Sequence, residues 1–139
     1  MNEDSLVLVH ALSEGQITQL AAMYRSEWWT SERTLEETRR GVAHSSMVFG
    51  LVDGTGGLQA FARVLTDYTF KALICDVIVL PETRGSGLGR RIMRHIQDHP
   101  QLSTVKHFEL YCKPEMVPYY EGLGFSAELD GICLMRRKV

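Results

Sequence analysis

Residues 76–93 read DVIVLPETRGSGLGRRIM, and this stretch decides the fold. Its first five residues belong to the apolar run Leu73–Leu80, which predicts a buried strand. Its last residues begin a segment whose apolar positions recur at helical spacing, which predicts a helix. Glycines between the two remove side chains that would block a ligand, and the free N–H groups of a helix N-terminus face an anion. The junction therefore predicts a phosphate-binding turn. The alternative is that the glycines only shape a tight turn.

The spacing of the glycines narrows the type of phosphate site. The P-loop pattern fails because Arg90 follows Gly89 where a Lys followed by Ser or Thr is required, and the Rossmann pattern G-x-G-x-x-G lacks its last glycine. The pattern R-x-x-G-x-G does fit, at Arg84, Gly87 and Gly89. A nucleotide-phosphate binder of either common type is therefore disfavoured.

Positive charge is concentrated at this turn. The chain carries 15 Lys plus Arg against 17 Asp plus Glu, a formal net charge of −2, which does not indicate a nucleic-acid-binding domain. No Asp or Glu lies between Glu82 and Asp98. Four arginines do, namely Arg84, Arg90, Arg91 and Arg94. A slightly acidic protein thus places its cations where an anion is expected.

The composition indicates one globular unit. The 139 residues are 45% hydrophobic, show no repeat, and are too few for two ordinary domains. The N-terminus resembles neither a signal nor a transit peptide, and no run reaches the roughly 18 apolar residues of a membrane span, so we expect a cytoplasmic protein without a membrane partner. Three widely spaced cysteines and no Cys/His cluster predict reduced thiols and no metal site.

Further elements follow on both sides of the central stretch. Capping boxes of Ser13 with Gln16 and of Thr34 with Glu37 begin two helices, and the sequence D-G-T-G-G joins two strands in a hairpin. The expected strands are Ser5–His10, Met47–Val52, Leu58–Leu65, Leu73–Leu80, Val105–Tyr111 and Ile132–Arg136. With a short helix near Glu115–Leu123, the order is β-α-α-β-β-β-α-β-α-β, a mixed sheet of the α/β or α+β class.

A second motif lies downstream, where residues 118–125 read PYYEGLGF. Together the two motifs resemble the acetyl-CoA-binding and aromatic–Tyr signatures of the GNAT N-acetyltransferase superfamily, in the same order and at a compatible separation. The resemblance implies a single GNAT-like domain over residues 1–139, with a mixed, mainly antiparallel central sheet flanked by about four helices. It also implies that acetyl-CoA (coenzyme A) is the co-substrate, without a metal.

By this resemblance, particular residues would hold acetyl-CoA. The backbone of Val77, Ile78 and Val79 would pair with the pantetheine arm. The pyrophosphate would lie against the turn and the helix start, at Arg84, Gly85, Ser86, Gly87, Leu88, Gly89 and Arg90. The Asn that often precedes the second signature in the family falls at Lys113 here, so that contact is lost or replaced by another group.

Acyl transfer from a thioester to an amine needs oxyanion stabilisation, a proton for the thiolate and a neutral amine. A backbone N–H within Val77–Val79 is the candidate for the oxyanion. Tyr120 matches the family's catalytic Tyr, and its ordinary pKa of ~10 suits a general acid for a thiol leaving group. Asp76 interrupts an apolar strand, so it is either a general base facing a cleft or a structural carboxylate with hydrogen-bond partners. Weaker candidates for the base are Asp67 and Glu27.

Aromatic residues indicate where an acceptor binds. Trp28 and Trp29 lie in a polar segment, and Tyr68 follows a predicted strand; these residues wall an acceptor pocket or pack between elements. We expect an enzyme that transfers acetyl from acetyl-CoA to a primary amine by direct attack in a ternary complex, because no Ser or Cys lies in a nucleophile motif. A catalytically silent acyl-CoA-binding sensor is the alternative. The identity of the amine and a possible homodimer have no sequence signature.

Overall fold

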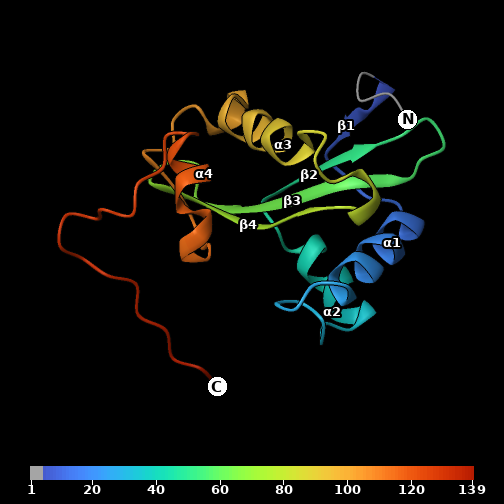
Figure 1. Ribbon diagram of the computed structural model, residues 1–139, viewed down its shortest axis with the longest axis horizontal. Coiled ribbons are helices and arrows are strands. Elements are labelled where there is room, and N and C mark those ends of the chain that lie inside the picture. The colour runs from blue at the N-terminus through green and yellow to red at the C-terminus, as the bar shows by residue number, and fades with distance from the viewer. Residues whose placement is uncertain (1–4) are drawn as a thin grey trace.

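The computed structural model describes residues 5–139, which form a five-stranded sheet with helices on both faces (Figure 1). The strands are β1 (Val7–Val9), β2 (Met47–Val52), β3 (Leu58–Thr66), β4 (Lys71–Val79) and β5 (His107–Leu110). The helices are α1 (Glu14–Arg25), α2 (Leu35–Ala43), α3 (Leu88–Gln97) and α4 (Val117–Glu121). Short 3₁₀ turns are η2 (Pro81–Thr83), η3 (Pro100–Leu102) and η4 (Pro114–Met116). Residues 1–4 of the predicted domain lie outside the described residues.

The strands lie in sequence order across the sheet. β1 to β4 pair antiparallel, and β5 pairs parallel with β4, from Lys71 opposite His107 to Ile74 opposite Leu110. Helix α3 lies in the crossover between these two parallel strands and covers one face, while α1 and α2 cover the other (Figure 1). The predicted mixed, mainly antiparallel sheet flanked by four α-helices is confirmed for the described residues.

Two apolar cores lie on the two faces of the sheet. Alternate side chains of β2 divide between them, because Phe49 and Leu51 pack on the α3 side whereas Val48 and Val52 pack on the α1 side. The α3 side also contains Leu88, Ile92, Met93 and Ile96, and the α1 side contains Leu20, Met23 and Tyr24. Burial of these apolar side chains holds α3 and α1 against the two faces of the sheet.

Local signals account for the helix starts and the first hairpin. Ser13 Oγ accepts a hydrogen bond from the Gln16 N–H at 3.1 Å, and Gln16 Oε1 accepts from the Ser13 N–H at 2.8 Å. Thr34 and Glu37 repeat this arrangement at the start of α2. Both predicted capping boxes and the predicted β2–β3 hairpin are confirmed.

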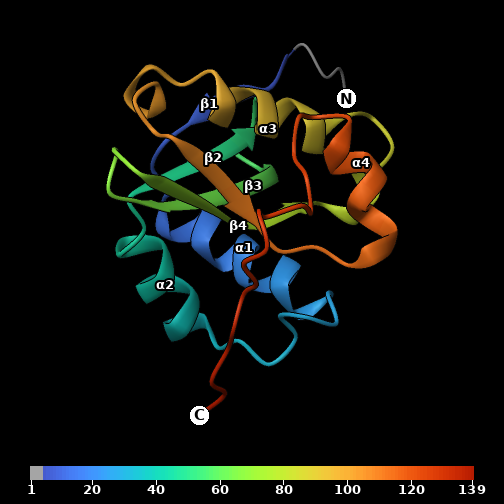
Figure 2. The same ribbon diagram turned by 90° about the vertical axis from the view of Figure 1, so that its left-hand side faces the viewer.

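The predicted C-terminal strand at Ile132–Arg136 is wrong. Within residues 5–139 no strand follows α4, and the end of the chain runs away from the body of the protein (Figures 1 and 2). Apolar residues favour a strand only where the backbone also finds a hydrogen-bonding partner, and no other strand of the described chain pairs with this segment. Its side chains are left exposed.

The three cysteines are free thiols. Cys75 is half-buried in β4, whereas Cys112 and Cys133 are exposed. None of the helices formed by residues 5–139 is both long enough and apolar enough to cross a membrane.

Candidate active site

A β-bulge in β4 shapes the candidate site. The β3–β4 register is regular from Ala72 to Cys75 and again at Ile78 and Val79, but it slips by one residue between the two stretches. Asp76 lies at the slip with a φ of 58°, a left-handed conformation that Asp tolerates better than most residues. As a result Ala72 packs on the α3 side whereas Ile78, also at an even position, packs on the α1 side.

Beyond the bulge, β4 has a neighbouring strand on only one side. β5 pairs with β4 only as far as Ile74, and no strand among residues 5–139 pairs with Val77–Val79 on that side. The Leu80 N–H donates to the Gln59 carbonyl of β3 at 2.8 Å, so strand alternation directs the backbone N–H groups of Val77 and Val79 away from β3. We call residues 77–79 the open edge, because an extended amide chain adds to such an edge by hydrogen bonding.

After η2 the chain forms what we call the anion cradle, residues 84–90, which comprises the turn before α3 and the first residues of that helix. Gly85 has a φ of 87° and Gly87, the N-cap of α3, a φ of 84°, so both positions favour glycine. Among residues 5–139, a Cβ on Gly85 would meet no atom within 4 Å, and no side chain caps the first turn of α3. The N–H groups of that turn carry the positive end of the helix dipole. The residues present therefore fit a phosphate group.

Two arginines of the cradle are held by neighbouring side chains. Arg84 forms an ion pair with Glu27 of the α1–α2 loop, and its Nε donates to the Val79 carbonyl at 3.3 Å. Arg90 lies over the ring of Tyr119, with its Cζ 5.8 Å from the ring centroid. Their charge stays at the helix N-terminus, but Glu27 neutralises part of it.

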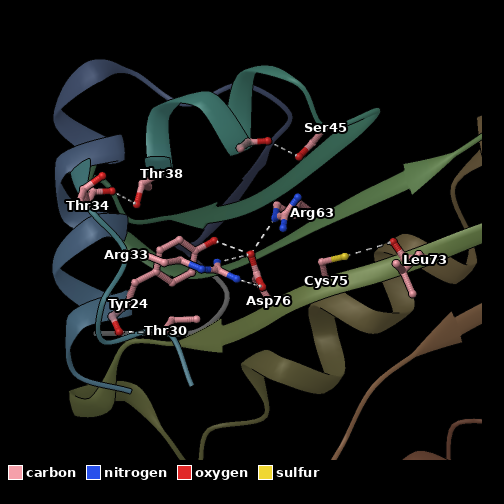
Figure 3. Close-up of polar contacts among 11 residues, drawn as sticks. Tyr24, Thr30, Arg33, Thr34, Thr38, Ser45, Arg63, Leu73, Cys75 and Asp76 are labelled. Carbon is pink, nitrogen blue, oxygen red and sulfur yellow. Dashed lines mark hydrogen bonds and ion pairs between the residues drawn. The ribbon is translucent and has the colours of Figure 1, made fainter. Parts of the chain in front are cut away.

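The Asp76 carboxylate lies among three polar partners (Figure 3). Arg33 donates from both terminal nitrogens, at 2.7 and 3.2 Å, and Arg63 Nε donates at 2.7 Å. The Tyr24 hydroxyl donates at 2.9 Å. We call these four residues the Asp76 cluster. The Asp76 side chain is only 6% exposed, so the cluster ties α1, the α1–α2 loop and β3 to the bulge in β4.

These partners set the protonation states in the cluster. Burial by itself raises the pKa of Asp76, but the hydrogen bonds from Arg33 and Arg63 outweigh burial and hold that pKa below its ordinary value. Burial, followed by the charge of Asp76, raises the pKa of Tyr24 well above its ordinary value. Asp76 is therefore a charged acceptor at neutral pH whose lone pairs are occupied. These contacts favour the structural carboxylate over the general base.

Sequence reasoning missed the partners of Asp76. A signal existed for Arg63, which interrupts the apolar strand LQAFARVL as Asp76 interrupts LICDVIVL, because opposite charges on neighbouring strands favour an ion pair. Arg33 offered no such signal, since it lies in an irregular segment 43 positions away from Asp76 in the sequence.

Helix α4 places Tyr119 beside the cradle and Tyr120 next to Tyr119. Tyr119 Oη lies 3.5 Å from the position that a Cβ on Gly89 would take, and the rings of Tyr119 and Tyr120 meet edge to face with 4.9 Å between centroids. Burial, with smaller contributions from Tyr119 and Cys112, raises the pKa of Tyr120 to about 12. Tyr120 therefore keeps its proton at neutral pH, as a general acid must.

Trp28 connects the α1–α2 loop to the segment before α4. Lys113 Nζ lies 4.1 Å from the centroid of the Trp28 ring, a cation–π contact. Trp28 is 69% exposed and Trp29 39% exposed, so neither side chain is buried between helices. Both rings are therefore accessible to a ligand, and Lys113, at the position of the family's usual Asn, is engaged with Trp28.

The other predicted site residues lie elsewhere or are occupied. Tyr68 lies in the β3–β4 turn, at the far end of β4 from the open edge, and its hydroxyl donates to the Ser46 carbonyl at 3.2 Å. Asp67 accepts backbone hydrogen bonds within the same turn. Glu27 is paired with Arg84. The structure does not bring Tyr68 or Asp67 to the open edge.

A family of known proteins matches this part of the chain. Residues 44–127 match the family described as Acetyltransferase (GNAT) domain, a range that runs from just before β2 to just after α4. The match thus contains the bulge, the open edge, the cradle and α4.

Individual relatives cover more of the chain. The uncharacterized N-acetyltransferase ycf52 of Porphyra purpurea is 29% identical over 117 residues, which are 82% of this chain and 67% of that protein. The chloroplastic serotonin N-acetyltransferase 2 of Oryza sativa subsp. japonica is 35% identical over 103 residues, 72% of this chain and 52% of that protein. A GNAT-family crystal structure from Xanthomonas campestris pv. campestris superimposes with a TM-score of 0.82 at 31% identity, covering 96% of this chain and 93% of the other.

Proposed function

This chain belongs to the GNAT acetyltransferase family, and on that premise we propose that it transfers the acetyl group of acetyl-CoA to a primary amine by direct attack in a ternary complex. The observation that carries this proposal is the open edge, which is followed, after Leu80 and the 3₁₀ turn η2, by the anion cradle at the start of α3. This stretch of chain thus offers hydrogen bonds first to an extended amide chain and then to a phosphate.

We assign the binding of acetyl-CoA to the backbone. The N–H and C=O groups of the open edge, residues 77–79, would pair with the pantetheine amides, because β3 holds that strand from its other side. The N–H groups from Gly85 to Arg90 would hold the pyrophosphate. Glycine at positions 85 and 87 supports this role, since both combine a positive φ with a position beside the helix N-terminus.

When bound, acetyl-CoA supplies the acetyl thioester on which the chain's own groups act. A backbone N–H of the open edge is fixed in the sheet, so it stabilises the negative charge that develops on the carbonyl oxygen at little cost in reorganisation. Tyr120 donates its phenolic proton to the departing sulfur as the C–S bond breaks and the C–N bond forms. The amine's surplus proton passes through water to the Tyr120 phenolate, which restores the acid, so charge and protons balance over the reaction.

We assign Asp76 a positioning role rather than that of the base. Its carboxylate is occupied by Arg33, Arg63 and Tyr24, and it lies at the bulge that gives the open edge its direction. The acceptor amine is therefore expected to enter in its neutral form. Trp28 and Trp29 would line its approach, because both rings are accessible beside the α1–α2 loop.

Release of free thiol from acetyl-CoA in the presence of an amine panel tests the proposal. The panel contains an arylalkylamine such as serotonin, an amino acid, a polyamine and a lysine peptide. We expect turnover with at least one amine and intersecting initial-velocity lines, as a ternary complex requires. Calorimetric binding of coenzyme A without thiol release from any amine would favour the silent acyl-CoA-binding sensor, and parallel lines would contradict direct attack.

We also propose that residues 1–139 act as one domain in the cytoplasm. The three free thiols support a reducing compartment, where unpaired cysteines persist. Expression of the chain with a fluorescent tag tests the location, and accumulation in an organelle would contradict it.

A further inference from the structure

A small pocket lies on the α1–α2 side of the sheet, against the Asp76 cluster. Its volume is about 200 Å³, and its lining comes from α1, the α1–α2 loop, α2 and β3. Three residues of that lining, Tyr24, Arg33 and Arg63, also bind the Asp76 carboxylate (Figure 3). We call this cavity the arginine pocket.

Arg63 presents unused hydrogen-bond donors to the arginine pocket. Its Nε donates to Asp76 at 2.7 Å, but its two terminal nitrogens have no hydrogen-bond partner among residues 5–139. Every buried side-chain nitrogen and oxygen of those residues has a partner, so these two nitrogens are accessible to solvent, although the Arg63 side chain is only 19% exposed. The terminal nitrogens of a guanidinium form a planar fork that fits the two oxygens of a carboxylate.

The two arginines carry more positive charge than the Asp76 cluster neutralises. Arg33 and Arg63 share one carboxylate, that of Asp76, which leaves an excess of one positive charge. Glu37 is the remaining charged residue of the lining, but it is exposed, and its Oε1 accepts a hydrogen bond from the Thr34 N–H at 2.9 Å. A monoanion bound to Arg63 would balance the excess, because partly buried charges are stable when they are paired.

The arginine pocket also has room for an organic group. Among residues 5–139, a Cβ on Gly41 of α2 would meet no atom within 4 Å. Tyr24 and Val42 add apolar surface, and Arg33 Cζ lies 4.7 Å from the centroid of the Tyr24 ring, which holds that guanidinium in place. A carboxylate matches the single excess charge, whereas a phosphate group carries up to two negative charges at neutral pH.

The arginine pocket lies next to the proposed site of acetyl transfer. Asp76, which the arginines of the pocket hold, directly precedes Val77, where the open edge begins. We propose that the acceptor amine also carries a carboxylate, which binds the terminal nitrogens of Arg63 in the arginine pocket while the amine reaches the open edge. This proposal rests on the acetyl transfer proposed above, and it names the acceptor class as small amino-carboxylates.

Initial rates of thiol release from acetyl-CoA with matched pairs of amines test the proposal. Each pair consists of an amino acid and the amine that its decarboxylation would give, such as γ-aminobutyrate with propylamine, phenylalanine with phenethylamine, and 5-hydroxytryptophan with serotonin. We expect kcat/KM to be at least about tenfold higher for the amino acid in at least one pair, because the charge-assisted hydrogen bonds to Arg63 are made only by that member.

The outcomes separate this proposal from the proposed function. If the decarboxylated amine reacts as well as the amino acid in every pair, or better, carboxylate recognition is overturned while acetyl transfer stands. If no amine of any pair releases thiol, the proposed acetyl transfer is contradicted, and the acceptor class is contradicted with it.

A variant that fills the arginine pocket shows where the carboxylate binds. Gly41→Leu removes no charge, and leucine favours a helix more than glycine does, so we expect α2 to form. We expect kcat/KM for the preferred amino acid to fall at least about tenfold, because the side chain occupies the space of the ligand. Gly15→Leu, in the first turn of α1 and outside the pocket lining, is the matched control and should leave this value unchanged.

A second variant tests the charge. Arg63→Gln removes the free donors and should bring kcat/KM for the two members of the pair to within about twofold of each other. Arg40→Gln, the same change at an exposed position of α2 outside the lining, should keep the preference. Because Arg63 also binds Asp76, circular dichroism first establishes that Arg63→Gln is folded, and Gly41→Leu tests the pocket independently of that result. A preference for the amino acid that survives in Gly41→Leu or in folded Arg63→Gln overturns the proposal.

Discussion

The two ends of β4 differ in their neighbours, and the difference creates the site. Lys71–Ile74 pairs with β3 on one side and with β5 on the other, so its backbone groups are used within the sheet. Val77–Val79 pairs with β3 alone. Asp76 lies between the two ends, at the bulge. In the proposed function, the first part of β4 is therefore scaffold and the last part is the binding edge. The change between them requires one inserted residue together with the side chains that hold it in place.

The largest expected effect comes from removing the negative charge of Asp76, which lies at the bulge between the two ends of β4. Asp76→Asn leaves the guanidinium groups of Arg33 and Arg63 without their carboxylate, and breaking a buried pair in this way costs about 3 kcal/mol of unfolding free energy. Urea unfolding measures this loss. Asp67→Asn, at an exposed turn of the same strand pair, is the control and should cost much less than Asp76→Asn. Equal losses in the two variants would show that the Asp76 cluster does not hold the bulge.

The same carboxylate gives stability a pH dependence. The folded-state pKa of Asp76 is held below its ordinary value, so its stabilisation is present above the unfolded pKa of ~3.9 and is lost as the pH falls through the folded value. The stability difference between the original chain and Asp76→Asn should therefore shrink in acid. Urea unfolding at a series of pH values checks this, and a constant difference down to about pH 3 contradicts it.

The next effect concerns the proposed proton donor on α4. Tyr120→Phe removes the proposed proton donor and should lower kcat by about a hundredfold while the calorimetric affinity for coenzyme A is kept. Tyr68→Phe, at the other end of β4, should leave kcat unchanged. Because the pKa of Tyr120 is raised to about 12, the original enzyme should lose no activity through Tyr120 as the pH rises toward 10. Unchanged turnover in Tyr120→Phe would remove Tyr120 from the mechanism.

A smaller effect is expected where the open edge meets α3. Gly87→Ala forces a side chain into a φ of 84° at the helix start and should weaken coenzyme A binding about tenfold. Gly56→Ala imposes the same strain, since Gly56 also has a φ of 84°, but in the β2–β3 turn away from the cradle. Calorimetry measures the affinity of both variants for coenzyme A. A loss of affinity in Gly87→Ala but not in Gly56→Ala shows that the effect comes from the cradle and not from backbone strain in general. If both variants bind coenzyme A alike, the cradle does not depend on Gly87.

The smallest effect concerns the ion pair between the α1–α2 loop and the cradle. Glu27→Gln removes the partner of Arg84, whose side chain is half exposed, so the unfolding free energy should change by less than about 1 kcal/mol. If Glu27 were instead the general base, thiol release would fall strongly in this variant. We expect kcat to stay within about twofold of the original value, since neutral amine needs no carboxylate.

The comparison also explains how much of the fold was predictable. Elements with local signals were predicted with their type and place, such as the two capping boxes and the β2–β3 hairpin. The terminal strand at Ile132–Arg136 was not, because its apolar residues lack a pairing strand in the described chain. A strand is a property of two segments, and its own sequence carries only half of the information.

The candidate site likewise has features that the sequence predicts and features that it does not. The glycine turn that opens α3 was predictable because its glycines and its helix start are contiguous in the sequence, from residue 84 to residue 90, whereas its phosphate-binding role stays a prediction. The Asp76 cluster was not, because Tyr24 lies 52 positions from Asp76 and Arg33 lies 43 positions from it. The bulge itself was hidden for a further reason, since an Asp inside an apolar strand indicates a partner but does not indicate a slip in register.

Amide hydrogen exchange with and without acetyl-CoA compares the two ends of β4 in one experiment. We expect acetyl-CoA to slow exchange at Val77, Val79 and the amides from Gly85 to Arg90, while Lys71–Ile74 exchanges as before. Unchanged exchange at Val77 and Val79 in the presence of saturating acetyl-CoA would contradict the assignment of the open edge as the binding surface.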